Sequence, residues 1–533
     1  MAVRKLLGSN LLLLRLPKSQ QSFFSRQIDL QSIIKRTNQL TLNRLLENNE
    51  QIDGKKWSTV REEVLTTVST VNEFNVDNII INRCCEANKQ FLALNYISYL
   101  VDERKQDLNI ASIVKYFILL SNYKQTLDSE DVKRIFQFYD DIRKKYDVLD
   151  SKTAEGCILA LSLTNRWKEA INIFEESRKL GNFSTIAYTS IITAAFNNNE
   201  PEIAWRYLEQ TRPDQRPQKK VYVAYIQFCQ RHYHTFDESK EAIEKMFDFW
   251  VRHDIYPHVT IIMAFMQYLS NTGNWNYAST TVDKDGACGC CHTSMPRFEM
   301  SEEDHKALIK YILNNAIVGK DVFQNTTPTE LNKFLKYIDE TKPYDVVIDG
   351  LNAAYSLNRK SKMPTERAKE LRKIVTLLRE QKKRIFILGK RHMLKWSRKE
   401  MNIIENNSFL FLTNNTSEDD LFTIYAALVS GSDTYIMSRD FLRDHKFILT
   451  DLKIKRIFRN WQLTHQIMPY YKQIGSVSVL QIIYPPPYVI TLHKDEKGWH
   501  IPYRESLENS ENELPKSWMC LRIKQKIENK NLS

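Results

Sequence analysis

The sequence has no long apolar run, few cysteines and few glycines or prolines, and each shortage excludes a class of protein. No run approaches the roughly 18 apolar residues that suggest a membrane-spanning helix. Eight cysteines in 533 residues do not suggest a disulfide scaffold. With 13 Gly, 15 Pro, 42% hydrophobic and 26% charged residues, the composition is globular. The chain is too long for one core, so we expect two to four domains.

Acidic residues are in deficit over the whole chain. Lys and Arg number 76 against 64 Asp and Glu, which gives a formal net charge of +12. This excess favours a polyanionic partner, either nucleic acid or an anionic membrane. Because no membrane span is evident, nucleic acid is the better candidate.

The first 28 residues contain no acid. They include several serines and the apolar run Leu11–Leu14. Such a leader is typical of a mitochondrial transit peptide, which we predict over residues 1–30. A disordered basic tail is the alternative, and a secretory signal is disfavoured because the apolar run is short. The basic residues of this leader are Arg4, Lys5, Arg15, Lys18 and Arg26.

The sequence from about 70 to 285 has helical periodicity and repeats. "NRWKEAINIFEESRKLG" (165–181) aligns with "NEPEIAWRYLEQTRPDQ" (199–215) at an offset of 34 residues, and looser copies lie on either side. A period in the mid-thirties predicts a stacked α-solenoid, because a two-helix unit cannot bury its apolar face alone. Tetratricopeptide and pentatricopeptide arrays share this period, and the basic charge favours the RNA-binding pentatricopeptide kind. A helical scaffold that binds protein is the alternative.

After residue 340 short apolar runs alternate with helical sequence. Strands are predicted at 345–349, 384–388, 409–412 and 434–437, and helices at 364–382, 393–404 and 418–430. This alternation predicts a parallel sheet with crossover helices. Near 488–501 the sequence predicts a β-hairpin that turns at Glu496–Gly498.

Carboxylates follow three of the predicted strands. Asp349 ends the first strand, and Asp419 and Asp420 follow the third. Asp440 follows the fourth strand, with Asp444 one helical turn later. The carboxyl ends of parallel strands share one edge of the sheet, which is where such folds place their chemistry.

Acids gathered at one edge would repel each other and raise one another's pKa. Mg²⁺, which prefers oxygen ligands, removes this conflict. A carboxylate-held pair of Mg²⁺ ions suits in-line attack of water on a phosphodiester. Alternatively, Asp419 and Asp440 could each cap a helix. Nearby basic residues are suited to phosphate contacts, or form an ordinary solvated surface: Lys390, Arg391, Arg439, Arg443 and Lys446.

The segment "ACGCCHTS" (287–294) contains three cysteines. Cys288 and Cys291 have the spacing of a zinc knuckle, although Cys290 could replace Cys291. A closed tetrahedral site needs four ligands, and the candidates His500 and Cys520 lie far along the chain. His292 and His493 compete as ligands, and ordinary core packing is the alternative for His500 and Cys520.

Several of these segments together resemble proteinaceous RNase P. The resemblance rests on "DVVIDGLNAAY", "SEDDLFTIYAAL", "SRDFLRDH", "WHIP" and "SWMC", preceded by pentatricopeptide-like repeats and a CxxC. It spans roughly 70–525. It implies a Mg²⁺-dependent ribonuclease P, an endoribonuclease that removes the 5′ leader of precursor tRNA and leaves a 5′-phosphate and a 3′-hydroxyl. A catalytically inert RNA-binding factor and a PIN-like nuclease acting on other mitochondrial RNAs are the alternatives.

The resemblance also implies roles for individual residues. The magnesium ligands would be Asp349, Asp419, Asp420 and Asp440, with Asn352, Asp444 and His445 supporting them. One structural Zn²⁺ would be bound by Cys288, Cys291, His500 and Cys520. A tRNA methyltransferase and a short-chain dehydrogenase-like protein are the implied partners, in the mitochondrial matrix.

The expected fold class is multidomain, α followed by α/β. A linker is expected at 31–69, a pentatricopeptide-like solenoid at 70–285, and a C-terminal tail at 526–533. A zinc-binding β domain would comprise 286–340 plus 485–525. A PIN-like (NYN) metallonuclease domain would comprise 341–484.

Overall fold

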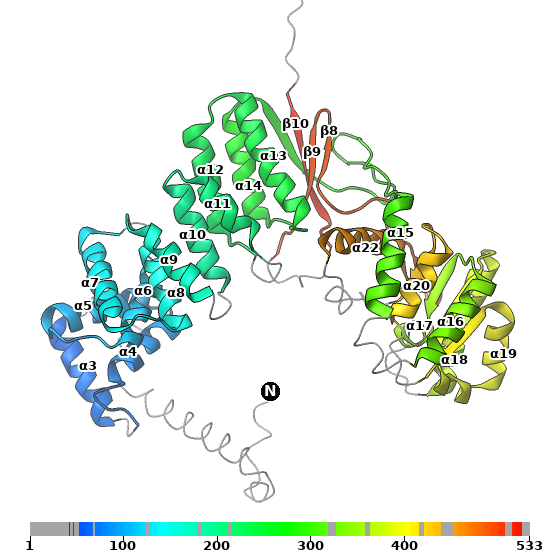
Figure 1. Cartoon of the computed structure of the whole chain (residues 1–533), viewed down its shortest axis with the longest axis horizontal. Coiled ribbons are helices and arrows are strands. Elements are labelled where there is room, and N and C mark those ends of the chain that lie inside the picture. Colours follow the sequence, from blue (N-terminus) through cyan, green and yellow to red (C-terminus); the bar gives the residue numbers. More distant parts are fainter. Residues whose placement is uncertain are drawn as a thin grey trace, which may run out of the picture. The chain divides into compact units, whose positions relative to one another are not determined.

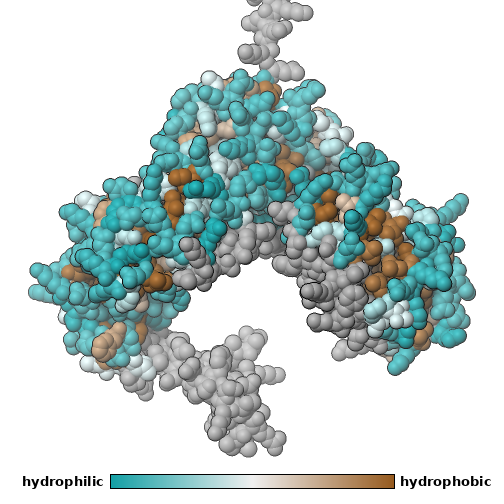
Figure 2. Space-filling model, in the orientation of Figure 1, coloured by the Kyte–Doolittle hydropathy of each residue, from teal (hydrophilic) through white to brown (hydrophobic). Residues whose placement is uncertain are grey.

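The computed structural model describes residues 42, 46, 53–67, 70–123, 127–178, 184–211, 216–317, 327–357, 363–414, 420–438, 451–506 and 514–524. The chain divides into two compact units, Met1–Ala242 and Ile243–Ser533. The predicted transit peptide and C-terminal tail lie outside the described residues. None of the described helices is both long and apolar enough to span a membrane. Hydrophilic residues cover most of the face seen in Figure 2, and apolar residues there form separate small groups.

The described part of the first unit is helical (Figure 1). Side chains that accept hydrogen bonds from the first turn begin three of its helices: Asp128, Asp150 and Ser184. The helices are α3 (Gly54–Thr67), α4 (Val76–Glu86), α5 (Gln90–Ser98), α6 (Ile110–Tyr123), α7 (Ser129–Lys145), α8 (Ser151–Leu161), α9 (Trp167–Arg178), α10 (Thr185–Asn197), α11 (Pro201–Glu209) and α12 (Lys219–His232), and α13 (Phe236–Arg252) continues into the second unit.

The repeat read from the sequence is present in the helix positions. Helices α9 and α11 begin 34 residues apart, as do α10 and α12. Ala170 and its counterpart Ala204 are both fully buried. The ring of Phe174 on α9 lies 4.9 Å from that of Tyr188 on α10 and 5.6 Å from that of Tyr207 on α11, so each helix pair packs on the next. The predicted α-solenoid is confirmed.

The second unit contains a four-stranded antiparallel sheet in the order β1-β10-β9-β8. Its strands are β1 (Trp275–Thr280), β8 (His493–Asp495), β9 (Gly498–Tyr503) and β10 (Ser517–Ile523), and helix α14 (Val259–Asn271) precedes β1. The β8–β9 hairpin turns where the sequence predicts. The sheet joins the segment before residue 286 to the end of the chain, and the expected domain boundaries stay predictions.

A six-stranded sheet in the order β4-β3-β2-β5-β6-β7 forms the rest of the second unit. Neighbouring strands are parallel from β4 through β3, β2 and β5 to β6, and β7 pairs antiparallel with β6. The strands are β2 (Val346–Asp349), β3 (Ile385–Lys390), β4 (Phe409–Thr413), β5 (Tyr435–Met437), β6 (Gln466–Ile474) and β7 (Val477–Ile483). The parallel sheet predicted from the sequence is confirmed, and the β6–β7 hairpin is an addition to it.

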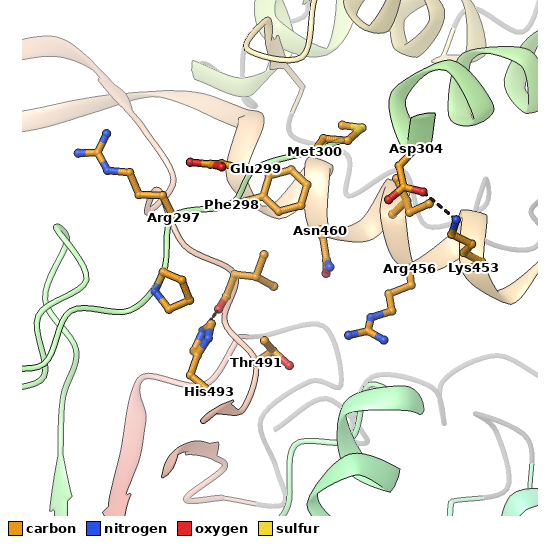
Figure 3. A pocket seen from close by; sticks show the side chains of 13 residues that line it. Arg297, Phe298, Glu299, Met300, Asp304, Lys453, Arg456, Asn460, Thr491 and His493 are labelled. Carbon is orange, nitrogen blue, oxygen red and sulfur yellow. Dashed lines mark hydrogen bonds and ion pairs between the residues drawn. The ribbon is translucent and has the colours of Figure 1, made fainter. Parts of the chain in front are cut away.

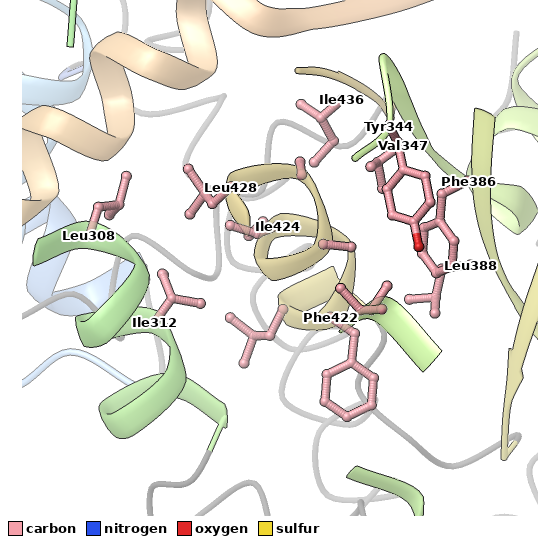
Figure 4. Packing of buried hydrophobic residues seen from close by; sticks show 14 of the residues in the cluster. Leu308, Ile312, Tyr344, Val347, Phe386, Leu388, Phe422, Ile424, Leu428 and Ile436 are labelled. Carbon is pink, nitrogen blue, oxygen red and sulfur yellow. The ribbon is translucent and has the colours of Figure 1, made fainter. Parts of the chain in front are cut away.

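Helices cover both faces of this sheet because the side chains of its strands alternate between two cores. Val347 and Phe386 point to a core formed with α15 (Glu302–Tyr311), α16 (Pro328–Thr341), α20 (Asp420–Ser430) and α22 (Leu452–His465). Figure 4 shows α20 at the centre of this core. Val346 and Ile348 point to the other core, formed with α17 (Gly350–Leu357), α18 (Pro364–Glu380) and α19 (Arg398–Asn407). The helix predicted at 393–404 is instead a 3₁₀ helix, Arg391–Lys395, followed by α19.

Candidate metal centres of the second unit

Asp349 is the last residue of β2 and lies at the carboxyl edge of the parallel sheet. Its side chain is 8% exposed, and its Oδ1 accepts a hydrogen bond of 2.9 Å from the backbone N–H of Asn352. Asp349 therefore holds the start of α17 in the manner of an N-cap, and the same bond fixes its carboxylate at the rim. A carboxylate buried this far needs a cation or further hydrogen bonds to stay ionised.

The turn after Asp349 is unusually close. A Cβ added to Gly350 would lie 2.9 Å from both the Cγ2 of Ile387 and the backbone oxygen of Leu388. Only glycine fits at this approach of α17 to β3 without displacing the backbone of β3. The Asp-Gly pair in the sequence thus places the acid and its helix directly against the neighbouring strand.

Other predicted site residues reach the same edge from neighbouring elements. Asp420 is the first residue of α20, which follows the carboxyl end of β4. Lys390 ends β3 next to β2 and is 8% exposed, while Arg391 is exposed and begins the 3₁₀ helix. Parallel strand order thus places Asp349, Asp420 and these two basic residues at one end of the sheet. The other predicted members lie outside the described residues: Asp419, Arg439, Asp440, Arg443, Asp444, His445 and Lys446.

The four predicted zinc ligands do come together. One ligand atom from each of Cys288, Cys291, His500 and Cys520 lies within 4.8 Å of every other. Cys288, His500 and Cys520 are buried, and Cys291 is partly exposed. A tetrahedral site with thiolate and imidazole ligands requires such spacing. Within the described residues this is the group of His, Cys and acidic side chains that could hold a metal ion.

Two paired strands and one turn build the cluster. His500 on β9 and Cys520 on β10 are directly paired across the sheet, so their side chains share one face. Cys288 and Cys291 come from a tight turn in which the N–H of His292 donates to the oxygen of Cys288 at 2.9 Å. Cys290 is exposed on this turn and lies outside the cluster.

The competing histidines are placed elsewhere. His292 is exposed, with a positive φ of 58°. His493 has its Nε2 2.8 Å from the oxygen of Val489 and stacks on Trp518. The structure thus selects Cys291 over Cys290, and His500 over His292 and His493, as members of the four-residue group.

The electrostatics of the cluster favour a bound cation. Burial acts to raise the pKa of Cys291, but hydrogen bonds with Thr293, Arg522 and His500 outweigh it and lower the pKa to about 5. Burial and the neighbouring Cys288 and Cys291 raise the pKa of Cys520. Crowded thiolates of this kind repel one another unless a divalent ion neutralises them, so the donor set fits a structural metal site.

Sequence reasoning missed the residues around the cluster. The Nη2 of Arg522 donates to Cys291 Sγ at 2.5 Å and lies 2.9 Å from His500 Nε2. Asp495 accepts from Arg522 Nη1 and thereby holds the guanidinium in place. Arg522 stands two residues after Cys520 on the same strand, so strand alternation alone puts it on the metal-facing side. The spacing of two residues from Cys520 was therefore the sequence signal that could have identified Arg522.

Comparison with known proteins agrees with this architecture. The family model described as protein-only RNase P matches residues 282–520, which include Asp349 and all four residues of the cysteine–histidine cluster. The mitochondrial ribonuclease P catalytic subunit of Mus musculus is 27% identical over 483 residues, covering 89% of this chain and 79% of the mouse protein. The Rattus norvegicus subunit is also 27% identical, over 489 residues and 78% of its length.

A solved structure gives the same fold. The crystal structure of nuclear proteinaceous RNase P 2 from Arabidopsis thaliana superposes with a TM-score of 0.58 at 15% identity, covering 85% of this chain and all of the plant chain. The arrangement of helices and strands in this chain thus occurs in a known architecture. Residues 282–520 match the protein-only RNase P family model, and the chain is similar over most of its length to mitochondrial ribonuclease P catalytic subunits.

Proposed function

We propose that this chain is the catalytic subunit of a mitochondrial protein-only ribonuclease P that removes 5′ leaders from precursor tRNAs. One observation carries the proposal: in a protein-only RNase P domain, the central strand β2 ends on a carboxylate, Asp349, that is fixed at the sheet's carboxyl edge. The chain's excess of basic residues fits an RNA substrate.

We assign catalysis to the acidic residues at the carboxyl edge of the parallel sheet. Asp349, Asp419, Asp420 and Asp440 would hold two Mg²⁺ ions, which, when bound, activate the attacking water and stabilise the leaving oxygen. Asp349 is oriented by the N–H of Asn352, so its carboxylate keeps one position as the substrate arrives. Asp444 and His445 are proposed to support the ligands.

Basic residues beside the acids would hold the RNA backbone. Lys390 is the last residue of β3, the strand next to β2, and Arg391 follows it; we assign both to phosphates near the cut. Attack of water on the phosphorus and departure of the 3′ oxygen of the leader leave a 5′-phosphate on the tRNA and a 3′-hydroxyl on the leader.

The cysteine–histidine cluster is proposed as a structural Zn²⁺ site. Three thiolates and one imidazole match the closed four-ligand sites of zinc, with no position left for a substrate. The ion would tie the turn at 288–291 to strands β9 and β10, which are more than 200 residues away in sequence. We therefore assign the ion a role in stabilising the second unit, which contains the six-stranded sheet.

We propose that the solenoid binds the tRNA, because pentatricopeptide-like repeats are typical of RNA-binding proteins. We also propose the mitochondrial matrix as location, and a tRNA methyltransferase and a short-chain dehydrogenase-like protein as partners. These assignments rest on the resemblance to the animal enzymes, and activity in their presence is part of the test below.

The deciding experiment uses 5′-labelled precursor tRNA, Mg²⁺ and the full chain, with and without the two partners. We expect one cut at the mature 5′ end, leaving a 5′-phosphate on the tRNA and no product in EDTA. Cuts only in messenger or ribosomal RNA fragments would replace the proposal with a different nuclease activity. RNA binding without any cleavage, with both partners present, would reduce the chain to an RNA-binding factor.

A further inference from the structure

The pocket drawn in Figure 3 lies away from the proposed catalytic edge. It has a volume of about 420 Å³, and Phe298 is one of its lining residues. The ring of Phe298 lies 6.1 Å from that of His465, which in turn lies 5.8 Å from the ring of Tyr435 at the start of β5. The pocket is therefore at the amino edge of the parallel sheet, opposite Asp349. A further residue that acts in the proposed reaction has to reach the carboxyl edge.

Helix α16 runs along β4 toward the carboxyl edge. Tyr344, which follows the helix, has its ring 5.8 Å from that of Phe409 at the start of β4. Tyr337, within the helix, has its ring 5.5 Å from that of Phe411 in the middle of the strand. Because the contacts advance along β4 while they move back along α16, the two elements are antiparallel. The first turn of α16 consequently lies beside the carboxyl end of β4.

Glu330, in this first turn, reaches the residue that follows β4. Its Oε1 accepts a hydrogen bond of 2.5 Å from the backbone N–H of Asn414. Seven helical residues and three strand residues both span about 10 Å, so the step from Tyr337 to Glu330 matches the step from Phe411 to Asn414. Glu330 is only 8% exposed. Its carboxylate is therefore an internal anchor for the end of the strand and not a solvated surface group.

The position of Glu330 in its helix has another common use. Thr327 is the N-cap of α16, and its hydroxyl accepts from the backbone N–H of Glu330 at 3.3 Å, which makes Glu330 the N3 residue. A glutamate at N3 often folds back to the N-cap of its own helix. Here the Oε1 of Glu330 accepts from a different element, so the bond couples α16 to the end of β4.

Phe334 lies one turn further along the same side of α16 and contacts α20. Its ring stacks on that of Phe422 at 4.5 Å and an interplanar angle of 13°, and it meets the ring of Phe411 edge-on at 5.4 Å. Phe422 is two residues after Asp420, the first residue of α20. Helix α16 thus contacts the end of β4 through Glu330 and the start of α20 through Phe334. These are the two ends of the connection that leads to Asp420.

We propose that Glu330 is a positioning residue of the nuclease: by holding the end of β4 through the Asn414 N–H, it keeps Asp420 in place to bind Mg²⁺. This inference rests on the proposed function. Glu330 acts through the backbone and touches neither the metal nor the RNA. Its role therefore requires a hydrogen-bond acceptor at the right reach, and it does not require a negative charge.

Three variants separate reach from charge. Glu330→Gln keeps the acceptor at the same length and removes the charge. Glu330→Asp keeps the charge but is one methylene shorter, and Glu330→Ala removes both. Glu340→Ala is the matched control, because Glu340 is a glutamate of the same helix that is exposed and pairs with Lys336 at 3.9 Å.

The first measurement is single-turnover cleavage of precursor tRNA over a range of Mg²⁺ concentrations, with the two partners present. Glu330→Gln should cleave within about threefold of the unaltered chain, since a neutral acceptor still holds the N–H. Glu330→Asp and Glu330→Ala should cleave about 10- to 100-fold more slowly and need more Mg²⁺ for half-maximal rate, as when other supports of metal ligands are removed. Affinity for precursor tRNA in Ca²⁺ should stay the same in all variants, as should the activity of Glu340→Ala.

The second measurement needs neither metal nor RNA. Hydrogen exchange followed by mass spectrometry reports on the backbone N–H of Asn414, which is protected only while it is bonded. The amide should exchange slowly in the unaltered chain and in Glu330→Gln, and faster in Glu330→Asp and Glu330→Ala. Thermal unfolding of each variant shows whether it is folded. If Glu330→Ala does not fold, the comparison of Gln with Asp decides.

Two outcomes would overturn the inference while leaving the proposed function intact. If Glu330→Asp cleaves normally and Glu330→Gln does not, Glu330 acts through its charge, as a ligand or a base would. If the Asn414 amide exchanges equally in every variant, or if all of them cleave normally, Glu330 does not position this edge. Absence of cleavage by the unaltered chain with its partners would instead count against the proposed function, and the exchange measurement would still test the anchor.

Discussion

The Sγ of Cys291 lies 3.2 Å from the Nε2 of His500, although the two residues are 209 positions apart in the sequence. Cys288 and Cys520 complete the group around this pair. A single ion at this point would therefore close a loop of more than 200 residues that contains the whole six-stranded sheet. Closing so long a loop lowers the entropy of the unfolded chain, so the site should contribute strongly to stability.

We predict one tightly bound zinc ion per chain, measured by elemental analysis of the purified protein. Cys288→Ser should lose the metal and lower the melting temperature by at least several degrees, because the remaining buried donors would repel each other and a ligand is gone. Protein that folds fully without zinc would contradict the assignment.

The matched control is Cys290→Ser. Cys290 stands on the same turn, but it is exposed and outside the cluster. The variant should keep its zinc and its melting temperature. Loss of zinc from Cys290→Ser with retention in Cys291→Ser would reverse the choice between the two thiols.

We predict that Asp349→Ala abolishes cleavage of precursor tRNA and changes its affinity for the RNA less than about threefold. The carboxylate is proposed to hold Mg²⁺ at the reacting phosphate, while most binding energy comes from contacts along the RNA backbone. Single-turnover cleavage and filter binding measure the two effects separately. Normal cleavage by this variant would remove Asp349 from the mechanism.

Asp345→Ala is its control, because Asp345 stands just before the other end of the same strand. Its Oδ2 accepts from the backbone N–H of Arg384 at 2.7 Å, far from the carboxyl edge of the sheet. This variant should lose some stability but retain cleavage. Equal loss of activity in both variants would indicate damage to the strand rather than loss of a metal ligand.

The parts of the fold that the sequence predicted are those whose burial leaves a simple pattern. Strands β2 and β3 are buried on both faces and therefore appear as continuous apolar runs. Strand β6 contains Pro469 and the polar pair Lys472–Gln473, and its last three residues are exposed, so it has no continuous apolar run and was missed. Helix α17 was also missed, since it starts at a glycine and has only eight residues.

The metal cluster was predictable in kind but not in detail. Spacing identified Cys288 and a partner two or three residues on, yet it could not separate Cys290 from Cys291. That choice depends on the tertiary position of β9, which decides the thiol that faces His500. Arg522, which donates to Cys291, was overlooked because no motif contains it.

We predict that Gly498→Ala disrupts the zinc-bearing strands. Gly498 has a φ of +152°, and a Cβ there would lie 1.9 Å from the backbone oxygen of Leu521 on the paired strand β10. The clash should cost more than about 2 kcal/mol of unfolding free energy, and it should speed zinc release because His500 is two residues away. Gly475→Ala is the control: its φ is +61° but nothing lies within 4 Å, so we expect a cost of only about 1 kcal/mol.

The final prediction concerns pH and His465, which ends α22. Burial lowers the pKa of His465, although its bond to the Trp461 carbonyl and the charge of Asp433 oppose the shift. Because the folded pKa is below the unfolded value of about 6.5, the unfolded chain binds more protons as the pH falls, and acid destabilises the fold. The ring of His465 stacks on that of Trp461 at 5.8 Å, and a phenylalanine can make the same contact. His465→Phe therefore keeps the packing and removes this dependence of stability on pH.

Urea unfolding at pH 7.5 and pH 5.5 measures the effect. The unaltered chain should lose more stability on acidification than His465→Phe, because only the unaltered chain has a buried imidazole whose pKa is lowered in the folded state. His232, which is exposed, is replaced in the same way as the control for loss of a histidine outside the core. Equal acid sensitivity of His465→Phe and the unaltered chain would show that the imidazole stays solvated in the folded protein, because only a buried imidazole ties its protonation to unfolding.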